Sequence, residues 1–185
     1  MQANNITPAD QLSDWLAQED SVRQQMQGSP LTEGHAQQPP HTLRGGLDAM
    51  QAMLRGELPP PAIAITLDFL LVEVGTGTAI FQGAPSRRHY NPLGSVHGGW
   101  FATLLDSAMG CAVHTMMPPG RGYTTAELSV NIVRAITDKV PRVRAQGRVI
   151  HCGRQLATAE AQLVGPDGKL YAHGTTTCLV FELAR

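Results

Sequence analysis

The sequence predicts an α+β domain in which one long helix packs on one face of an antiparallel β-sheet. Strand-like segments occur in two groups, and a single strongly apolar helix at about 98–115 separates them. The strands of the second group follow one another after short turns that contain Gly, Pro and Asp. Such short turns cannot make parallel crossovers, so neighbouring strands are expected to pair in antiparallel fashion.

Residues 1–45 differ in composition from the rest of the chain and are predicted to form an N-terminal extension. Residues 9–27 can form a polar helix whose apolar side chains share one face, namely Leu12, Trp15 and Leu16. The segment that follows is rich in Gly, Pro and Gln and is predicted to be a linker. Acidic side chains outnumber Arg23 in the helix, which argues against DNA binding. We expect a loosely ordered helical extension here, with the main domain at 46–185.

The main domain begins with a short predicted helix at 46–58, and the prolines at 59–61 end it. Six strands are predicted from alternating or apolar runs bounded by turn residues: 65–74, 77–85, 123–135, 140–151, 155–164 and 169–181. Charged side chains in these strands are expected on solvent-exposed faces or edges. They are Asp68, Glu73, Glu127 and Glu160, together with Arg142, Arg144 and Arg148.

The composition argues against several classes of protein. The chain has 14 basic and 15 acidic residues, so it lacks the positive charge of a nucleic-acid-binding surface. The cysteines, Cys111, Cys152 and Cys178, have neither disulfide-framework nor metal-ligand spacing, and no HExxH motif is present. The N-terminus lacks the pattern of a signal peptide, and no apolar stretch is long enough to span a membrane. We therefore expect a cytoplasmic protein that uses no metal ion.

Asp106 is the only charged residue between Trp100 and Val113, inside the strongly apolar helix. A helix that is apolar almost all round is a buried helix, and an isolated carboxylate within it has a large desolvation cost. Proteins keep such a group for a structural hydrogen bond or for chemistry. At this point the sequence leaves both interpretations open.

Two adjacent glycines, Gly98 and Gly99, stand at the start of this helix although glycine lowers helix propensity. Glycine lets a ligand approach the backbone closely. The N–H groups of a helix start carry partial positive charge and can receive an anion or a polarised carbonyl oxygen, as in an oxyanion hole. The alternative is that the two glycines only allow the preceding loop to turn.

The segment NPLGSVHGGWFATLLDSAMGCAV, at 91–113, resembles the signature of the hotdog-fold acyl-CoA thioesterases, in their phenylacetate-degradation (PaaI-like) branch. The shared features are an Asn-Pro-x-Gly loop, a His-Gly-Gly helix start and an Asp eight residues after the first of these glycines. The resemblance extends over roughly 45–183. It implies an antiparallel sheet wrapped around one long central helix, and hydrolysis of a small aryl- or acyl-CoA thioester.

The resemblance also implies roles for individual residues. The Gly98 N–H group matches the donor that polarises the thioester carbonyl, and Asp106 matches the family's nucleophile or general base. Asn91 and His97 match its positioning and polarising residues. Thr125, or the threonine before it if the alignment shifts by one, matches a residue that orients the attacking water.

The CoA part of such a substrate carries phosphates, which basic side chains and turn N–H groups can bind. The candidates are the turn residues Gly153, Arg154 and Gln155, with Arg134 at a strand end. Gly99 at the helix start is a further candidate for substrate binding. Trp100 and Phe101 are expected in the core, or alternatively around the acyl group. No cofactor is expected, because the CoA thioester is itself the substrate.

The spacing of Gly98 and Asp106 predicts a site shared between two chains. A helix rises about 1.5 Å per residue, so the separation of eight residues spans roughly 12 Å. Reacting atoms must come within about 3–3.5 Å of each other. If both residues serve one reaction, Asp106 must come from a neighbouring chain, and a two-fold axis gives two equivalent sites. The resemblance implies the same assembly, a homodimer or a homotetramer made of two dimers.

Two other functions remain as alternatives on the same fold. One is the binding or sensing of acyl-CoA without turnover, but such a module would not need a costly carboxylate at Asp106. The other is a hydratase, which would call for an Asp–His pair on one loop, whereas His97 lies nine residues before Asp106. We therefore favour thioester hydrolysis.

Overall fold

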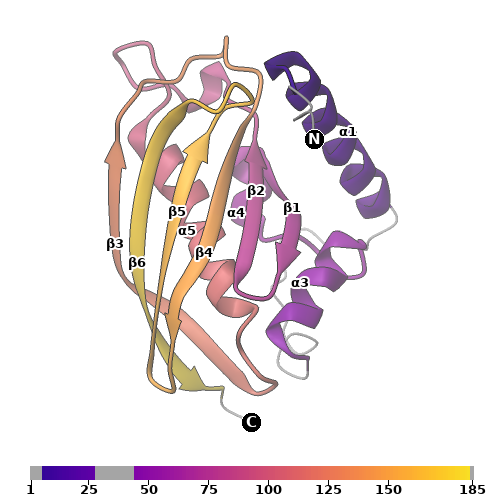
Figure 1. Ribbon diagram of the computed structural model, residues 1–185, viewed down its shortest axis with the longest axis vertical. Helices are drawn as coiled ribbons and strands as arrows, with labels where there is room; N and C mark the ends of the chain where they lie inside the picture. Colours follow the sequence, from indigo (N-terminus) through magenta and orange to yellow (C-terminus); the bar gives the residue numbers. More distant parts are fainter. Residues whose placement is uncertain (1–5, 28–43, 184–185) are drawn as a thin grey trace, which may run out of the picture.

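The computed structural model describes residues 6–27 and 44–183, in which a curved sheet packs around one helix and further helices lie beside it (Figure 1). The helices are α1 (Pro8–Met26), α3 (Gly46–Leu54), α4 (Ala62–Leu67) and α5 (Gly98–His114), and Arg87–His89 form a 3₁₀ turn. The strands are β1 (Phe69–Gly75), β2 (Thr78–Gly83), β3 (Arg121–Ile132), β4 (Val143–Cys152), β5 (Leu156–Val164) and β6 (Leu170–Glu182). No helix in these ranges is long and apolar enough to cross a membrane.

All six strands form one antiparallel sheet in the order β1-β2-β4-β5-β6-β3. The helix α5 packs against one face of this sheet, and β1 and β3 are its two edge strands (Figure 1). The predicted α+β class, with one long helix against an antiparallel sheet, is confirmed.

Small residues on the inner face of the sheet let α5 come close to it. An added Cβ at Gly147 in β4 would lie 2.3 Å from the carbonyl oxygen of Ala108 in α5, so only glycine fits there. Neighbouring inward positions carry buried alanines: Ala145, Ala157, Ala159 and Ala161. Against them α5 buries its large side chains: Trp100, Phe101, Leu104, Leu105, Met109 and Val113.

The other face of α5 carries short side chains. Gly99, Ala102, Thr103 and Asp106 follow the three- and four-residue spacing of one helix face, and all four are exposed or half-buried. The polar Asp106 therefore lies on the side of the helix that the sheet leaves open. This position removes part of the desolvation cost that a fully buried helix would impose.

Element boundaries differ from the predictions mainly at 62–68. The predicted first strand begins at 65, but residues 62–67 form α4, and Asp68 ends it in the left-handed conformation with φ of 54°. The run Ala-Ile-Ala-Ile-Thr-Leu is apolar and short, and periodicity cannot separate helix from strand in such a run. The strand predicted at 140–151 begins only at Val143, after Pro141, which has no N–H group for the ladder.

The N-terminal helix α1 is well formed and packs on the outer face of the sheet, beside β1 and β2 (Figure 1). Thr7 caps it by accepting a hydrogen bond from the Asp10 N–H group. The helix buries Trp15, Glu19 and Val22. The prediction of a loosely ordered extension is therefore wrong for this helix, whereas residues 28–43 of the predicted linker lie outside the described residues.

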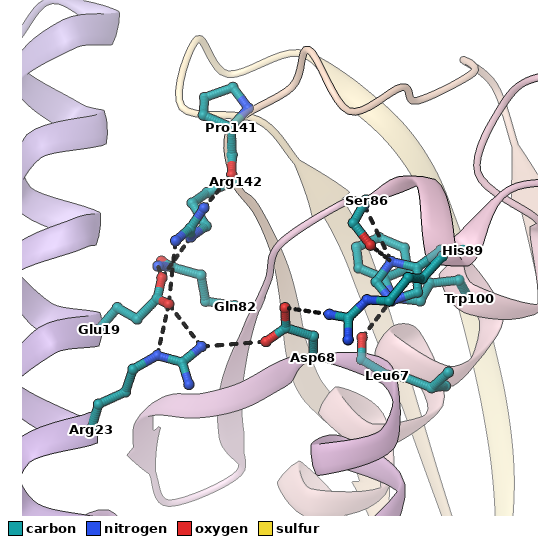
Figure 2. Close-up of polar contacts among 11 residues, drawn as sticks. Glu19, Arg23, Leu67, Asp68, Gln82, Ser86, His89, Trp100, Pro141 and Arg142 are labelled. Atoms are coloured by element: carbon teal, nitrogen blue, oxygen red, sulfur yellow. Dashed lines mark hydrogen bonds and ion pairs between the residues drawn. The ribbon is translucent and has the colours of Figure 1, made fainter.

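A buried polar cluster holds α1 in place (Figure 2). Glu19 is 3% exposed, and its carboxylate accepts hydrogen bonds from Arg142 Nε at 2.6 Å and Gln82 Nε2 at 2.7 Å. Arg23 Nε donates to the same carboxylate at 2.9 Å. Gln82 of β2 and Arg142, just before β4, thus find their hydrogen-bond partner in α1. The pattern of residues in the strands does not predict this contact.

The prediction that Arg144 lies on a solvated strand face is wrong. Its side chain is buried beneath α1, with the guanidinium 4.4 Å from the centre of the Trp15 ring. It donates to Gln82 Oε1 at 2.8 Å and to Gln18 Oε1 at 2.7 Å. Arg148, by contrast, is exposed and forms an ion pair with Glu160, as expected.

Replacing Glu19 with alanine is expected to destabilise the fold by roughly 3 kcal/mol, because a buried charged partner of Arg142 is removed. Burial alone would raise the pKa of Glu19, but hydrogen bonds from Arg142, Gln82 and Arg23 outweigh it and hold this pKa below its ordinary value. The resulting stability is present above the ordinary carboxyl pKa and is lost as the pH falls through the lowered one. Chemical denaturation at neutral and acid pH measures both effects.

The matched control is Glu57→Ala, which removes an exposed partner of Arg55. Exposed ion pairs contribute little, so this variant should unfold like the wild type at both pH values. A Glu19→Ala protein as stable as the control at neutral pH would contradict the role assigned to the buried cluster.

Candidate active site

The start of α5 is organised by His97. This residue is the N-cap of the helix, and its Nδ1 accepts a hydrogen bond from the Gly99 N–H group at 2.9 Å. The first N–H groups of a helix have no acceptor within it. No acceptor for the Gly98 N–H group is found among the described residues. Of the two adjacent glycines, Gly98 is thus the one whose N–H group is available to a ligand.

Asn91 holds the loop that leads into α5. Its side-chain oxygen accepts hydrogen bonds from the Leu93 N–H group at 2.8 Å and the Ser95 N–H group at 3.4 Å. Its Nδ2 donates to Ser95 Oγ at 3.1 Å. Gly94 completes the turn with a φ of +84°, which favours glycine. Asn91 therefore shapes the loop next to the helix start.

A cavity of about 290 Å³ lies beside this helix start. One wall comes from Asn91, Ser95, Val96, Gly98 and Phe101, and the other from residues 132–135, which include Arg134. The structure thus brings together three residues singled out by sequence, namely Asn91, Gly98 and Arg134. Phe101 borders the cavity while almost fully buried, whereas Trp100 is in the core and donates to the Leu67 carbonyl at 2.9 Å.

Asp106 and Thr125 form a second cluster, farther along the open face of α5. Thr125 Oγ1 donates to Asp106 Oδ1 at 2.9 Å. Thr125, and not Thr124, is the β3 residue that contacts Asp106. The contact fixes how the carboxylate is turned, and within the described residues no hydrogen bond to its other oxygen, Oδ2, is found.

The groups around Asp106 are poor nucleophiles at neutral pH. Burial, and secondarily the charge of Asp106, raises the pKa of the Cys111 thiol to about 12. Burial also raises the pKa of Tyr123 well above its ordinary value. Both groups therefore stay protonated at neutral pH.

The turn residues predicted to bind CoA, Gly153, Arg154 and Gln155, lie at the end of the sheet opposite to the Gly98 cavity. Gly153 N–H donates to the Leu156 carbonyl at 2.8 Å, and Arg121 donates to the Arg154 carbonyl. Near this turn, the Val149 N–H group of β4 donates to the Gly77 carbonyl, and the Gly77 N–H group donates to Thr115 Oγ1. Thr115 directly follows α5, so the turn lies at the end of α5 opposite to Gly98. Gly153, Arg154 and Gln155 are therefore not brought to the cavity at Gly98 within one chain.

Sequence reasoning missed much of the second cavity wall. The predicted strand continues to 135, but β3 ends at Ile132, and the N–H groups of Val133 and Arg134 both donate to the Tyr171 carbonyl. No local pattern indicates this turn. Within the described part of the chain, no group of three or more His, Cys, Asp and Glu side chains could hold a metal ion.

Comparison with known proteins identifies the family and the fold of this chain. Residues 93–172 match the family model of the thioesterase superfamily. A structure of a phenylacetic acid degradation-related protein from Ralstonia eutropha JMP134 is 30% identical, with a TM-score of 0.64, and the match covers 70% of this chain and 98% of that one. No curated protein matches this chain in sequence.

Two further structures are similar. A conserved protein from Pseudomonas aeruginosa is 30% identical, with a TM-score of 0.61, and the match covers 65% of this chain and 94% of that one. A mutant of the phenylacetic acid degradation protein PaaI from Thermus thermophilus is 25% identical, with a TM-score of 0.58 and coverage of 64% and 98%. Together with the helix start, the sheet and the open face of α5, these matches show that the chain belongs to the thioesterase superfamily, with the hotdog fold and in the PaaI-like branch.

Proposed function

We propose that this protein hydrolyses an acyl-CoA or aryl-CoA thioester to the free acid and CoA. The observation that carries the proposal is the pairing of an available Gly98 N–H group at a cavity with a carboxylate, Asp106, on the open face of the same helix. A thioesterase needs a donor for the oxyanion and a group that attacks or activates water. No cofactor is required for this chemistry.

In the proposed reaction the thioester carbonyl oxygen accepts a hydrogen bond from Gly98 N–H. Asp106 either attacks the carbonyl carbon or removes a proton from the attacking water. The Thr125 hydroxyl holds Oδ1 of the carboxylate, so that Oδ2 faces the substrate. The tetrahedral intermediate then collapses, and the C–S bond breaks with departure of the CoA thiolate. In the general-base route this releases the free acid, and the proton taken up by Asp106 passes to the thiolate. In the nucleophilic route it leaves a mixed anhydride on Asp106, which a water molecule then hydrolyses to the free acid. Arg134, at the rim of the cavity, is the proposed contact for a CoA phosphate.

The site is proposed to form between two chains. Within one chain the eight-residue separation of Gly98 and Asp106 along α5 amounts to roughly 12 Å. Two α5 helices packed antiparallel across a two-fold axis would face each other at Ala102, midway between these residues. Each Gly98 would then lie beside the Asp106 of the other chain. The short side chains of the open face, Gly99, Ala102 and Thr103, allow a close approach of the two helices.

The same pairing of helices would bring the turn at 152–156 of one chain close to the Gly98 cavity of the other. In antiparallel helices the end of one α5 lies near the start of the other. The partner's Gly153, Arg154 and Gln155 would thereby come toward the cavity at Gly98, where they could bind the CoA nucleotide. We therefore propose a dimer, alone or paired into a tetramer, as the active form.

The test of the function is thiol release from a panel of short-chain, medium-chain and aromatic CoA esters by the purified wild-type protein. Turnover of at least one ester supports the proposal, and the best ester identifies the acyl class. Tight binding of CoA esters without any turnover across the panel would instead support a sensing module.

A further inference from the structure

The two walls of the Gly98 cavity come from segments that are about forty residues apart in sequence. One wall is the loop before α5, and the other is the segment that follows β3. A backbone hydrogen bond joins them inside the protein, from the Val96 N–H group to the carbonyl of Ile136 at 2.9 Å. Ile136 is fully buried. This bond is a buried connection between the two walls.

A second connection joins the same two segments at the surface. The Tyr90 hydroxyl donates to Asp138 Oδ1 at 2.9 Å and also accepts a hydrogen bond from the Asp138 N–H group at 2.9 Å. Arg87 Nε donates to Asp138 Oδ2 at 3.0 Å. The hydrogen bonds from Arg87 and then from Tyr90 hold the pKa of Asp138 below its ordinary value. Asp138 is consequently charged at neutral pH and able to accept both bonds.

The tyrosine is the more important partner of Asp138. The side chain of Arg87 is 85% exposed, and an ion pair in that setting contributes little. The Tyr90 hydroxyl makes two hydrogen bonds in fixed directions, one of them to the backbone. Tyr90 also pairs with Val96 through a backbone bridge. Tyr90 therefore connects Asp138 to the loop that carries Asn91 and leads into Gly98.

We propose that Tyr90 and Asp138 are positioning residues that clamp the two walls of the Gly98 cavity and thereby set the affinity for the CoA thioester. Neither side chain lines the cavity. The inference rests on the proposed function for its kinetic consequence. Gly98 would hold the carbonyl from one wall while Arg134 would hold a phosphate from the other. Loosening the wall that carries Arg134 weakens a phosphate contact that is made equally in the ground state and the transition state, which raises KM and leaves kcat unchanged.

The test is the Tyr90→Phe variant, which removes only the hydroxyl. KM for the best CoA ester should rise about three- to tenfold while kcat stays within about twofold of wild type. Thr137→Ala is the matched control: it removes the hydrogen bond from Lys139 N–H within the same segment but does not connect the walls. Asp138→Asn keeps an oxygen acceptor and the N–H donor for Tyr90, so its KM should remain close to that of wild type.

A second readout does not depend on turnover. Hydrogen exchange at the Val96 amide of the substrate-free protein should be faster in Tyr90→Phe than in wild type or Thr137→Ala, because the clamp shields the Val96–Ile136 bond. If this rate and KM are both unchanged, the clamp is overturned. A kcat that falls as much as kcat/KM would also overturn it, because Tyr90 would then act on the reaction itself. If no ester is hydrolysed by the wild type, the exchange rate alone decides for or against the clamp.

Discussion

Asp106→Asn is expected to lower kcat for thioester hydrolysis by about three orders of magnitude. General acid–base catalysis contributes about 10²- to 10⁴-fold, and an amide can neither take a proton from water nor attack as an anion. The side chain has nearly the same shape as aspartate, and the amide oxygen can still accept the hydrogen bond from Thr125. The loss should therefore appear in kcat while binding of a CoA ester is kept. Thiol release and calorimetric titration of a CoA ester measure the two separately.

The matched control for this substitution is Asp48→Asn, at an exposed position on α3. It makes the same chemical change outside the Asp106–Thr125 cluster and should leave kcat unchanged. An Asp106→Asn protein that is folded and retains more than about a tenth of the wild-type kcat would contradict the assignment of Asp106 as base or nucleophile.

Gly98→Pro is expected to lower kcat by about 10²- to 10³-fold, because it removes the N–H group that would stabilise the oxyanion. The substitution suits the fold. Gly98 is the first residue of α5, a position at which proline is favoured. His97 before it is extended, with φ of −64° and ψ of 139°, as a residue preceding proline must be. Steady-state thiol release gives the effect, and circular dichroism checks the helix.

Gly98→Ala separates the loss of the N–H group from the added bulk. This variant keeps the donor and adds a methyl group 3.0 Å from Ile132 Cδ1, the movable tip of a side chain. Its kcat should stay within about tenfold of wild type. Equal loss of activity in the alanine and proline variants would mean that space at Gly98, and not its N–H group, is what the reaction needs.

The central helix and the antiparallel sheet could be predicted from the sequence because their signals are local. The apolar run of α5 begins at paired glycines and ends before Pro118, and the predicted bounds of 98–115 differ by one residue from Gly98–His114. The short apolar run at 62–67 has no such signal, and the left-handed Asp68 that ends α4 could not be foreseen. The burial of Arg144 could not be predicted either, because α1, far away in the sequence, creates its environment.

The candidate site also has features that the sequence predicts and features that only the structure shows. Asp106, Gly98 and Asn91 stand out through their spacing in one continuous motif, and the structure adds the contact of Asp106 with Thr125 across nineteen positions. The bond between Tyr90 and Asp138 spans 48 positions, and no pattern in either segment points to the other. The turn Gly153–Gln155 is prominent in sequence, yet within one chain it lies away from the Gly98 cavity.

The most direct test of the shared site is to mix the two inactive variants, Asp106→Asn and Gly98→Pro, under conditions that allow chains to exchange. In a mixed dimer, one site combines an intact Gly98 with an intact Asp106, and the other site carries both changes. Random pairing makes half of the dimers mixed, so activity should return to roughly a quarter of the wild-type rate. If the mixture is no more active than the separate variants although the chains have exchanged, Gly98 and Asp106 do not serve one reaction from two chains.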